Sequence, residues 1–263
     1  MNRRKVVNAS ADERGAERPR WLYGINAVAR RLAAEPASIR TIHLLRGDSS
    51  RRGGLAEAAE RAGILVQESD PATLRRLTGN DVHQGVAALA DPYRYRDLRE
   101  VVTAATGPVL ILDQVQDPHN LGALIRTAAA VGMAAVVIPR HGAAGITPAV
   151  EKVAAGAVND VPICQTSNLR RCLLDLRELG YWSIALSPTA DQNLFTLDLP
   201  GRPALVLGGE TGLRPLVEQT CDWRAAIPLR VGIESLNASV AGAVAMYEVA
   251  RRLDRLDSLA RRC

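Results

Sequence analysis

The chain has 263 residues, of which 47% are hydrophobic and 23% charged. These values are ordinary for a globular protein with one large domain or two small ones. It contains no run of 18 apolar residues, and no apolar stretch follows the basic residues at its N-terminus. The sequence therefore predicts neither a membrane span nor a signal peptide, and we expect a cytoplasmic protein.

The net charge of +5 is unevenly distributed, because residues 1–20 hold six Lys or Arg against three Asp or Glu. This excess favours a nucleic-acid partner, but it is equally typical of a solvated tail. The four cysteines are scattered, without C-x-x-C spacing and without a neighbouring histidine. We therefore expect no zinc site, no other metal site and no disulfide framework.

The N-terminal third predicts a small α/β unit. Residues 1–20 are polar and charged, which is typical of a disordered tail. Helices are expected at 25–33, 55–62 and 72–77, and strands at 39–45, 64–66 and 85–90. These elements define a domain over 21–90. The polar stretch after it contains Pro92 and shows no periodicity, so we place a linker at 91–107.

A second alternating series follows and defines a domain over 108–255. Strands are expected at 109–112, 135–138, 161–164, 182–186, 204–207 and 225–227. Helices are expected at 121–131, 148–157, 169–179, 216–220 and 238–253. Short apolar strands that alternate with helices predict a mostly parallel sheet with both faces covered.

Three strand ends in the second series are rich in Gly, Asn, Ser and charge. They are the segments 113–128, 207–213 and 227–241. Ligands bind at the carboxyl ends of the strands in an open α/β sheet. The sequence has neither a G-x-G-x-x-G motif after a strand nor a G-x-x-x-x-G-K-[ST] motif, which disfavours dinucleotide and triphosphate sites. We therefore expect a ligand that is bound by backbone and small polar groups.

Each segment also has a simpler structural interpretation. Asn120 could cap a helix that starts at Leu121, and Arg126 could be a solvated helix residue. The glycines at 208 and 209 could serve a tight turn, and Ser235 or Asn237 could cap the last helix. The occurrence of all three segments at strand ends favours a common site over three unrelated caps and turns.

Together the segments resemble the three motifs of the SpoU/TrmH family of RNA ribose 2′-O-methyltransferases, part of the SPOUT superfamily. The first resembles D-x-x-x-D-P-x-N-x-G-x-x-x-R-T-A, from Asp113 to Ala128, and the third resembles I-P-(six residues)-S-L-N-x-S-x-A, from Ile227. The second motif usually reads G-x-E-x-x-G-L, and 208–213 is one residue shorter between Glu and Gly. Residues 21–90 resemble the substrate-binding domain that precedes the catalytic domain in many members.

The resemblance implies a parallel-sheet α/β domain with a C-terminal trefoil knot, preceded by a small α/β RNA-binding domain of the ribosomal L30e-like type. It also implies a homodimer and S-adenosylmethionine as the cofactor. In the family the knot loops hold this cofactor through backbone contacts. Carried over to this chain, the cofactor-binding residues are Leu207, Gly208, Gly209, Ile227, Pro228 and Leu236.

The catalytic residues that the resemblance implies are Asn120, Arg126, Glu210, Ser235 and Asn237. A ribose 2′-hydroxyl is a poor nucleophile, so it must be deprotonated or polarised and held in line with the methyl donor. Arg126 could be a base or a phosphate ligand, and the second role is chemically easier because a guanidinium stays protonated.

The substrate that the resemblance implies is a guanosine of 23S ribosomal RNA. Two alternatives stay open at this point: a transfer RNA methyltransferase, and a non-catalytic RNA-binding protein that keeps the fold.

Overall fold

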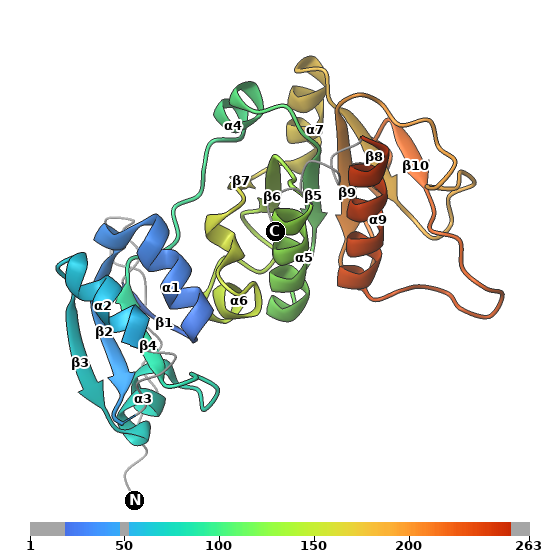
Figure 1. Ribbon diagram of the computed structural model, residues 1–263. Helices are drawn as coiled ribbons and strands as arrows, with labels where there is room; N and C mark the ends of the chain where they lie inside the picture. Colours follow the sequence, from blue (N-terminus) through green and yellow to red (C-terminus); the bar gives the residue numbers. More distant parts are fainter. Residues whose placement is uncertain (1–18, 48–52, 254–263) are drawn as a thin grey trace, which may run out of the picture.

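A computed structural model describes residues 19–47 and 53–253 of the chain. The predicted tail therefore lies almost entirely outside the described residues. Arg20, which the prediction assigned to that tail, instead begins strand β1. The described chain forms two sheets, an N-terminal one of four strands and a C-terminal one of six (Figure 1).

The N-terminal unit contains a mixed sheet with the strand order β1-β4-β2-β3. Strands β2 and β3 are parallel, while β1 and β2 both run antiparallel to β4. Helices α1 and α2 pack on one face of this sheet and bury a core that includes Val28, Ile42 and Val86. The elements are β1 (Arg20–Tyr23), α1 (Ile25–Ala34), η1 (Pro36–Ser38), β2 (Ile39–Leu45), α2 (Gly53–Arg61), β3 (Leu65–Ser69), α3 (Pro71–Thr78) and β4 (Val86–Ala90).

The segment 91–107, where we predicted a linker, contains a helix that the sequence analysis did not predict. It contains α4 (Leu98–Ala104), which starts where the Asp97 side chain accepts a hydrogen bond from the backbone N–H of Glu100. Val102 on this helix is 1% exposed and packs into the C-terminal core. Tyr93 and Tyr95, before the helix, pack edge to face against each other and against the same domain.

The C-terminal sheet has the order β10-β8-β9-β5-β6-β7, and all its strands are parallel. Its central strands are apolar along their length and are buried by helices on both faces, as the sequence predicts. The elements are β5 (Val109–Asp113), α5 (Pro118–Ala130), β6 (Ala135–Pro139), α6 (Pro148–Val153), η2 (Ala157–Asn159), β7 (Ile163–Thr166), α7 (Leu169–Glu178), β8 (Trp182–Leu186), β9 (Pro203–Gly208), α8 (Pro215–Glu218), β10 (Trp223–Ala225) and α9 (Ala238–Arg252).

The two largest differences between predicted and observed helix ends have local reasons. Helix α5 begins three residues early because Asp117 caps it and Pro118 occupies its first turn. The helix predicted at 148–157 ends at Val153, since Ala155 and Gly156 both adopt a positive φ.

After β10 the chain runs out from the sheet and returns as α9, which packs beside α5 (Figure 1). The fold class is the predicted one, a parallel-sheet α/β domain behind a smaller α/β unit. Within the described ranges, no helix is both long and apolar enough to cross a membrane.

Candidate active site

The first segment places Asn120 inside a helix rather than at its cap. Asp117 is the cap, because its carboxylate accepts a hydrogen bond of 2.9 Å from the backbone N–H of His119. Asn120 therefore lies in the first turn of α5, where it is 6% exposed. The interpretation of Asn120 as a helix cap is wrong, and its buried amide needs another partner.

The second segment forms a tight turn at the carboxyl end of β9. The N–H of Gly209 donates to the Asp113 carbonyl at 2.8 Å, and the N–H of Gly212 donates back to Gly209 at 3.0 Å. A Cβ on Gly208 would lie 2.2 Å from the backbone of Gly212, and one on Gly209 would lie 2.3 Å from the carbonyl oxygen of Gln114. Only glycine allows these approaches, so the shortened motif is accommodated by a closely packed turn.

A buried ion pair ties this turn to β5. Asp113 is fully buried, and its carboxylate accepts hydrogen bonds from the backbone N–H and the Nε of Arg214, each at 2.9 Å. The Nη2 of Arg214 also lies 2.8 Å from the same carboxylate. A buried carboxylate requires such partners, so this contact fixes the end of the second segment against the start of the first.

The third segment meets the first through Asn237. The Oδ1 of Asn237 accepts from the backbone N–H groups of Ser239 and Val240, at 2.9 and 3.4 Å, and so caps α9. Its Nδ2 donates to the Oδ1 of Asn120 at 3.1 Å. The cap interpretation is therefore correct for Asn237, but the same side chain also satisfies the buried amide of the first segment.

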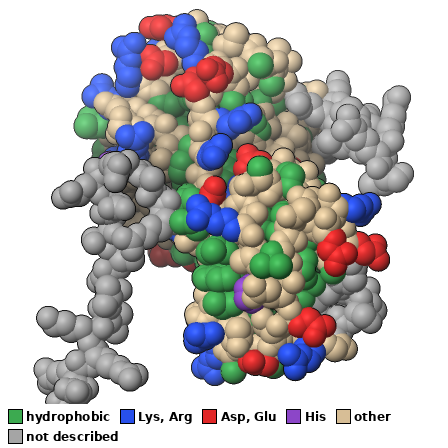
Figure 2. Space-filling view, turned by 90° about the vertical axis from the view of Figure 1, so that its left-hand side faces the viewer, with side chains coloured by type: hydrophobic (Ala, Val, Ile, Leu, Met, Phe, Trp, Pro, Cys, Tyr) green, Lys and Arg blue, Asp and Glu red, His purple; other side chains and the backbone are tan. Residues whose placement is uncertain are grey.

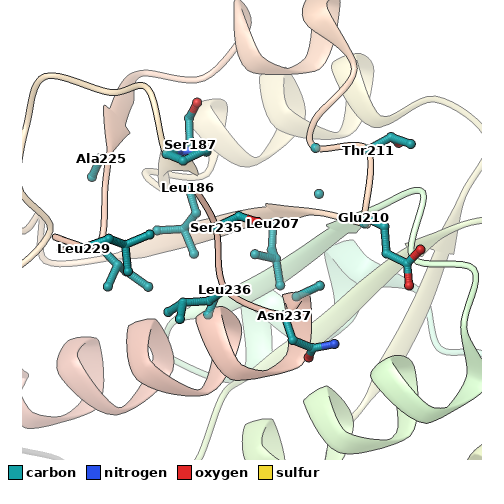
Figure 3. Close-up of a pocket in the computed structure, with 17 residues that line it drawn as sticks. Leu186, Ser187, Leu207, Glu210, Thr211, Ala225, Leu229, Ser235, Leu236 and Asn237 are labelled. Atoms are coloured by element: carbon teal, nitrogen blue, oxygen red, sulfur yellow. The ribbon is translucent and has the colours of Figure 1, made fainter. Parts of the chain in front are cut away.

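The loops enclose a cavity of about 480 Å³ at the carboxyl ends of β8, β9 and β10. One wall is apolar and is formed by Leu186, Leu207, Leu229 and Leu236. In Figure 3 the side chains of Glu210 and Asn237 lie at one end of the cavity, away from Leu186 and Leu229. The cavity thus has an apolar part and a polar end.

A second cavity of about 370 Å³ adjoins the first. Gln114, Gln116, Asp117 and Asn120 line it, and it shares the residues 209–211 with the larger cavity. Glu210 is exposed and borders both cavities. Glu210 therefore lies where the two cavities meet, and different molecules could occupy the two spaces.

The predicted site residues are largely brought together. Five of the six expected cofactor contacts line the larger cavity, and the exposed Pro228 does not. Ser235 and Asn237 line it as well. Among the predicted catalytic residues Arg126 is the exception, because it is exposed on α5 and lines neither cavity.

Sequence reasoning missed one strand end that lines the larger cavity. Leu186, the last residue of β8, and Ser187 and Pro188 after it line the cavity beside the second and third segments. The signal was weak, since Ser-Pro after an apolar strand is typical of any turn.

The described cysteines take no part in the site. Burial raises the pKa of the Cys164, Cys172 and Cys221 thiols to about 12, so they stay protonated at neutral pH. Among the described side chains, no group of three or more His, Cys, Asp or Glu is arranged to hold a metal ion.

Comparison with known proteins gives the same two-part division. The model of the SpoU rRNA Methylase family matches residues 107–247, and a model described as RNA 2′-O ribose methyltransferase substrate binding matches residues 21–96. The chain is 42% identical over 239 residues to a 23S rRNA (guanosine-2′-O-)-methyltransferase, RlmB, of Xanthomonas axonopodis, with 88% of this chain and 96% of the relative covered. The RlmB of Acinetobacter baylyi is 38% identical and is covered over 98% of its length.

Solved structures share the fold. The AdoMet-bound rRNA methyltransferase from Sinorhizobium meliloti superimposes with a TM-score of 0.75 at 22% identity, over 90% of this chain and 88% of that one. The AdoMet complex of the SpoU methyltransferase AviRb from Streptomyces viridochromogenes has a TM-score of 0.74 at 20% identity, over 88% and 89% of the two chains. The chain belongs to the SpoU rRNA methylase family.

Proposed function

We propose that this protein transfers a methyl group from S-adenosylmethionine to the 2′-hydroxyl of a guanosine ribose in 23S rRNA. The observation that carries the proposal is the position of Glu210, an acidic residue that lines both the larger cavity with its apolar wall and the smaller polar one. Membership of the family supports the reaction, and the RlmB relatives, matched over most of their length, support the nucleotide and the RNA.

The larger cavity suits S-adenosylmethionine. Its volume is in the range of small-molecule sites, and small residues such as Ala225, Ala238 and Ala241 leave room beside the leucine wall. The backbone at Leu207 and Gly208, and the strand-end residue Ile227, would hold the cofactor. When bound, the cofactor supplies an electrophilic methyl group on a sulfonium.

The smaller cavity would receive the ribose. Glu210 is placed to accept a hydrogen bond or a proton from a hydroxyl at the junction, while Asp117 is already engaged as a helix cap. Asn120, held by Asn237, offers an amide whose orientation is fixed before the substrate arrives. These residues would align the hydroxyl with the methyl group.

The active form would be a homodimer. Helix α9 exposes Val240 and Tyr247, which are 48% and 50% exposed and lie seven residues apart on one helix face. A second copy would cover this apolar stripe, and Arg126 on the neighbouring α5 would then lie near the interface, free to bind a phosphate of the RNA. Light scattering tests this, since Tyr247→Glu should yield monomers at concentrations where the wild type is dimeric.

The deciding experiment is mass spectrometry of ribose-methylated nucleosides from 23S rRNA and tRNA, incubated with S-adenosylmethionine and the protein. The expected result is one new 2′-O-methylguanosine in 23S rRNA with the wild type, and none with Glu210→Gln. If methylation is confined to tRNA, then tRNA and not 23S rRNA is the substrate. If the protein binds the cofactor but methylates neither RNA, the result favours a non-catalytic RNA-binding protein.

A further inference from the structure

The two units of the chain are packed against each other rather than merely tethered. Helix α1 and strand β1 of the N-terminal unit contact α6 and η2 of the C-terminal domain. A Cβ on Gly156 would lie 2.8 Å from the Cβ of Arg30, so the backbone of one unit reaches the side chains of the other. The direction in which the N-terminal unit points is therefore set by this contact.

An ion pair is buried in the middle of the contact. Arg31 is 1% exposed and Glu151 is 5% exposed, and the Nη2 of Arg31 lies 3.6 Å from the Oε1 of Glu151. The Nη1 of Arg31 also reaches Glu35 at 3.1 Å, and its Nη2 donates to the carbonyl of Asp91 at 3.3 Å. The guanidinium lies 5.8 Å from the centre of the Tyr93 ring. Arg31 thus joins α1, the interdomain segment and α6.

Stability alone does not explain this pair. The cost of removing two charges from water can exceed their attraction, and an apolar pair of similar shape often packs at least as well. Burial raises the pKa of Glu151, although Arg31 opposes the shift. Moreover, the Nε of Arg31 and the Oε2 of Glu151 are buried without a hydrogen-bond partner. A charge pair can favour one relative orientation of the two helices over others, because the charges meet only in that orientation. Apolar packing is less selective.

Further contacts around the ion pair also join the two units. The Tyr93 hydroxyl donates to the carbonyl of Val158 at 3.2 Å, and the Lys152 ammonium lies 5.6 Å from the centre of the Tyr23 ring. Arg30 forms an ion pair with Asp160 at the exposed rim.

Charge is not concentrated on the face that Figure 2 presents, where basic and acidic side chains are interspersed. RNA that contacts this face would therefore be guided by the placement of individual groups more than by one large basic surface.

We propose that Arg31 and Glu151 are positioning residues that hold the N-terminal unit in one orientation relative to the methyl-transfer cavity. An RNA bound by that unit then presents one ribose, at one distance, to Glu210. The placement of the ribose rests on the proposed function, whereas the fixed orientation of the two units is independent of it.

The first test measures the orientation directly in the full chain. Spin labels on cysteines introduced at Glu60 and Glu178, both exposed, report the distance between the units by electron paramagnetic resonance, with Cys221 and Cys263 replaced by serine. We expect a narrow distribution for the wild-type background and a broad one for Glu151→Gln. The matched control is Glu68→Gln, which removes a carboxylate from the exposed pair with Arg46.

The same variants separate positioning from folding. Glu151→Gln should raise the KM for 23S rRNA roughly tenfold, as expected when a substrate is held less well in line, and should leave the Kd for S-adenosylmethionine unchanged. A distance distribution and an RNA KM equal to those of Glu68→Gln would overturn the proposal. If the wild type itself fails to methylate 23S rRNA, the proposed function falls, while the distance measurement still decides the orientation.

A second variant covers the case in which Glu151→Gln does not fold. Arg30→Cys with Asp160→Cys can be joined across the exposed rim by a short reducible bifunctional thiol reagent. If the packed orientation is the working one, the joined protein should methylate RNA at the rate of the reduced protein. The opposite result is a loss of methylation on joining that is recovered on reduction, while proteins modified at only one cysteine stay active. It would show that the units must separate, and it would overturn the proposal.

Discussion

The larger cavity, which we propose binds the cofactor, and the contact between the two units differ in how they place charged side chains. The cavity is lined mainly by glycine, alanine, leucine and small polar residues, and its acidic residue, Glu210, is exposed. The interdomain contact instead buries Arg31 and Glu151 almost completely. A cavity that must bind and release a charged cofactor works through shape, because a buried charge there would have to be desolvated in every cycle.

A contact that must keep one geometry has the opposite requirement. Its charges are desolvated once, during folding, and afterwards distinguish the correct orientation from nearby ones. The comparison therefore predicts that changes of shape will do most damage in the cavity, and that changes of charge at constant shape will matter most in the contact.

The largest effect on cofactor affinity is expected from Gly209→Ala. The added methyl group would lie 2.3 Å from the carbonyl oxygen of Gln114, and since both sides are backbone, the turn must move. Affinity for S-adenosylmethionine should fall roughly a hundredfold, or about 2.8 kcal/mol, measured by calorimetry. Gly201→Ala is the control, because a Cβ there meets no atom within 4 Å. Wild-type affinity in Gly209→Ala would show that the turn does not shape the cofactor site.

Arg126→Ala should abolish methyl transfer and yet leave cofactor affinity within about tenfold, or roughly 1.4 kcal/mol. Arg126 lies outside both cavities, so its loss should leave the shape of the cofactor site intact. Single-turnover methylation of 23S rRNA and calorimetry measure the two quantities separately. A fully active alanine variant would remove Arg126 from the site.

Asn237 allows its two roles to be separated. Asn237→Ala loses the helix cap, at a cost of about 1 kcal/mol in the free energy of unfolding, as well as the bond to Asn120. Asn237→Asp keeps an acceptor for the cap but loses the Nδ2 donor. We expect Asn237→Asp to unfold like the wild type and to turn over roughly tenfold more slowly, because Asn120 is no longer held. If both activity and stability follow the cap alone, Asn237 has only a structural role.

Much of the fold was predictable because the signals were local. Alternation of apolar strands and helices gave nearly every element of both sheets, and Asp97 and Asp117 are cap residues that could have been recognised from sequence. Helix α4 was missed because its seven residues follow a Pro-containing stretch, and a short helix shows little periodicity. The early start of α5 was missed because Asn120, which is also a typical cap residue, fitted a helix that starts at Leu121.

The site was only partly predictable, for a different reason. The hydrogen bond between Asn120 and Asn237 joins residues that are 117 positions apart, and no local pattern reports it. The resemblance to a family grouped these residues without explaining their contact. The Arg31–Glu151 pair was invisible to sequence reasoning, since an arginine and a glutamate on amphipathic helices normally indicate solvated faces.

The smallest effect is expected in the pH dependence of the free energy of unfolding, compared between the wild type and Glu151→Gln. This comparison separates the contribution of Glu151 to stability from its contribution to orientation. Burial raises the pKa of Glu151 above its usual value, Arg31 lowers it in part, and Glu35 adds to the rise. Because the folded pKa lies above the unfolded one, protonation of Glu151 favours the folded state. This contribution is present at low pH and is lost as the pH rises through the folded pKa. Urea unfolding should therefore show the wild type gaining stability relative to Glu151→Gln as the pH falls from 7.

The orientation should respond in the opposite sense. Protonation removes the charge that Arg31 attracts, so the distance distribution between the units should broaden over the same pH range in which the wild type gains stability. The glutamine variant, which cannot titrate at this position, should be broad throughout. If acid instead costs the wild type stability relative to the variant, attraction by Arg31 outweighs burial at Glu151, and the pair would then stabilise the fold as well as direct it.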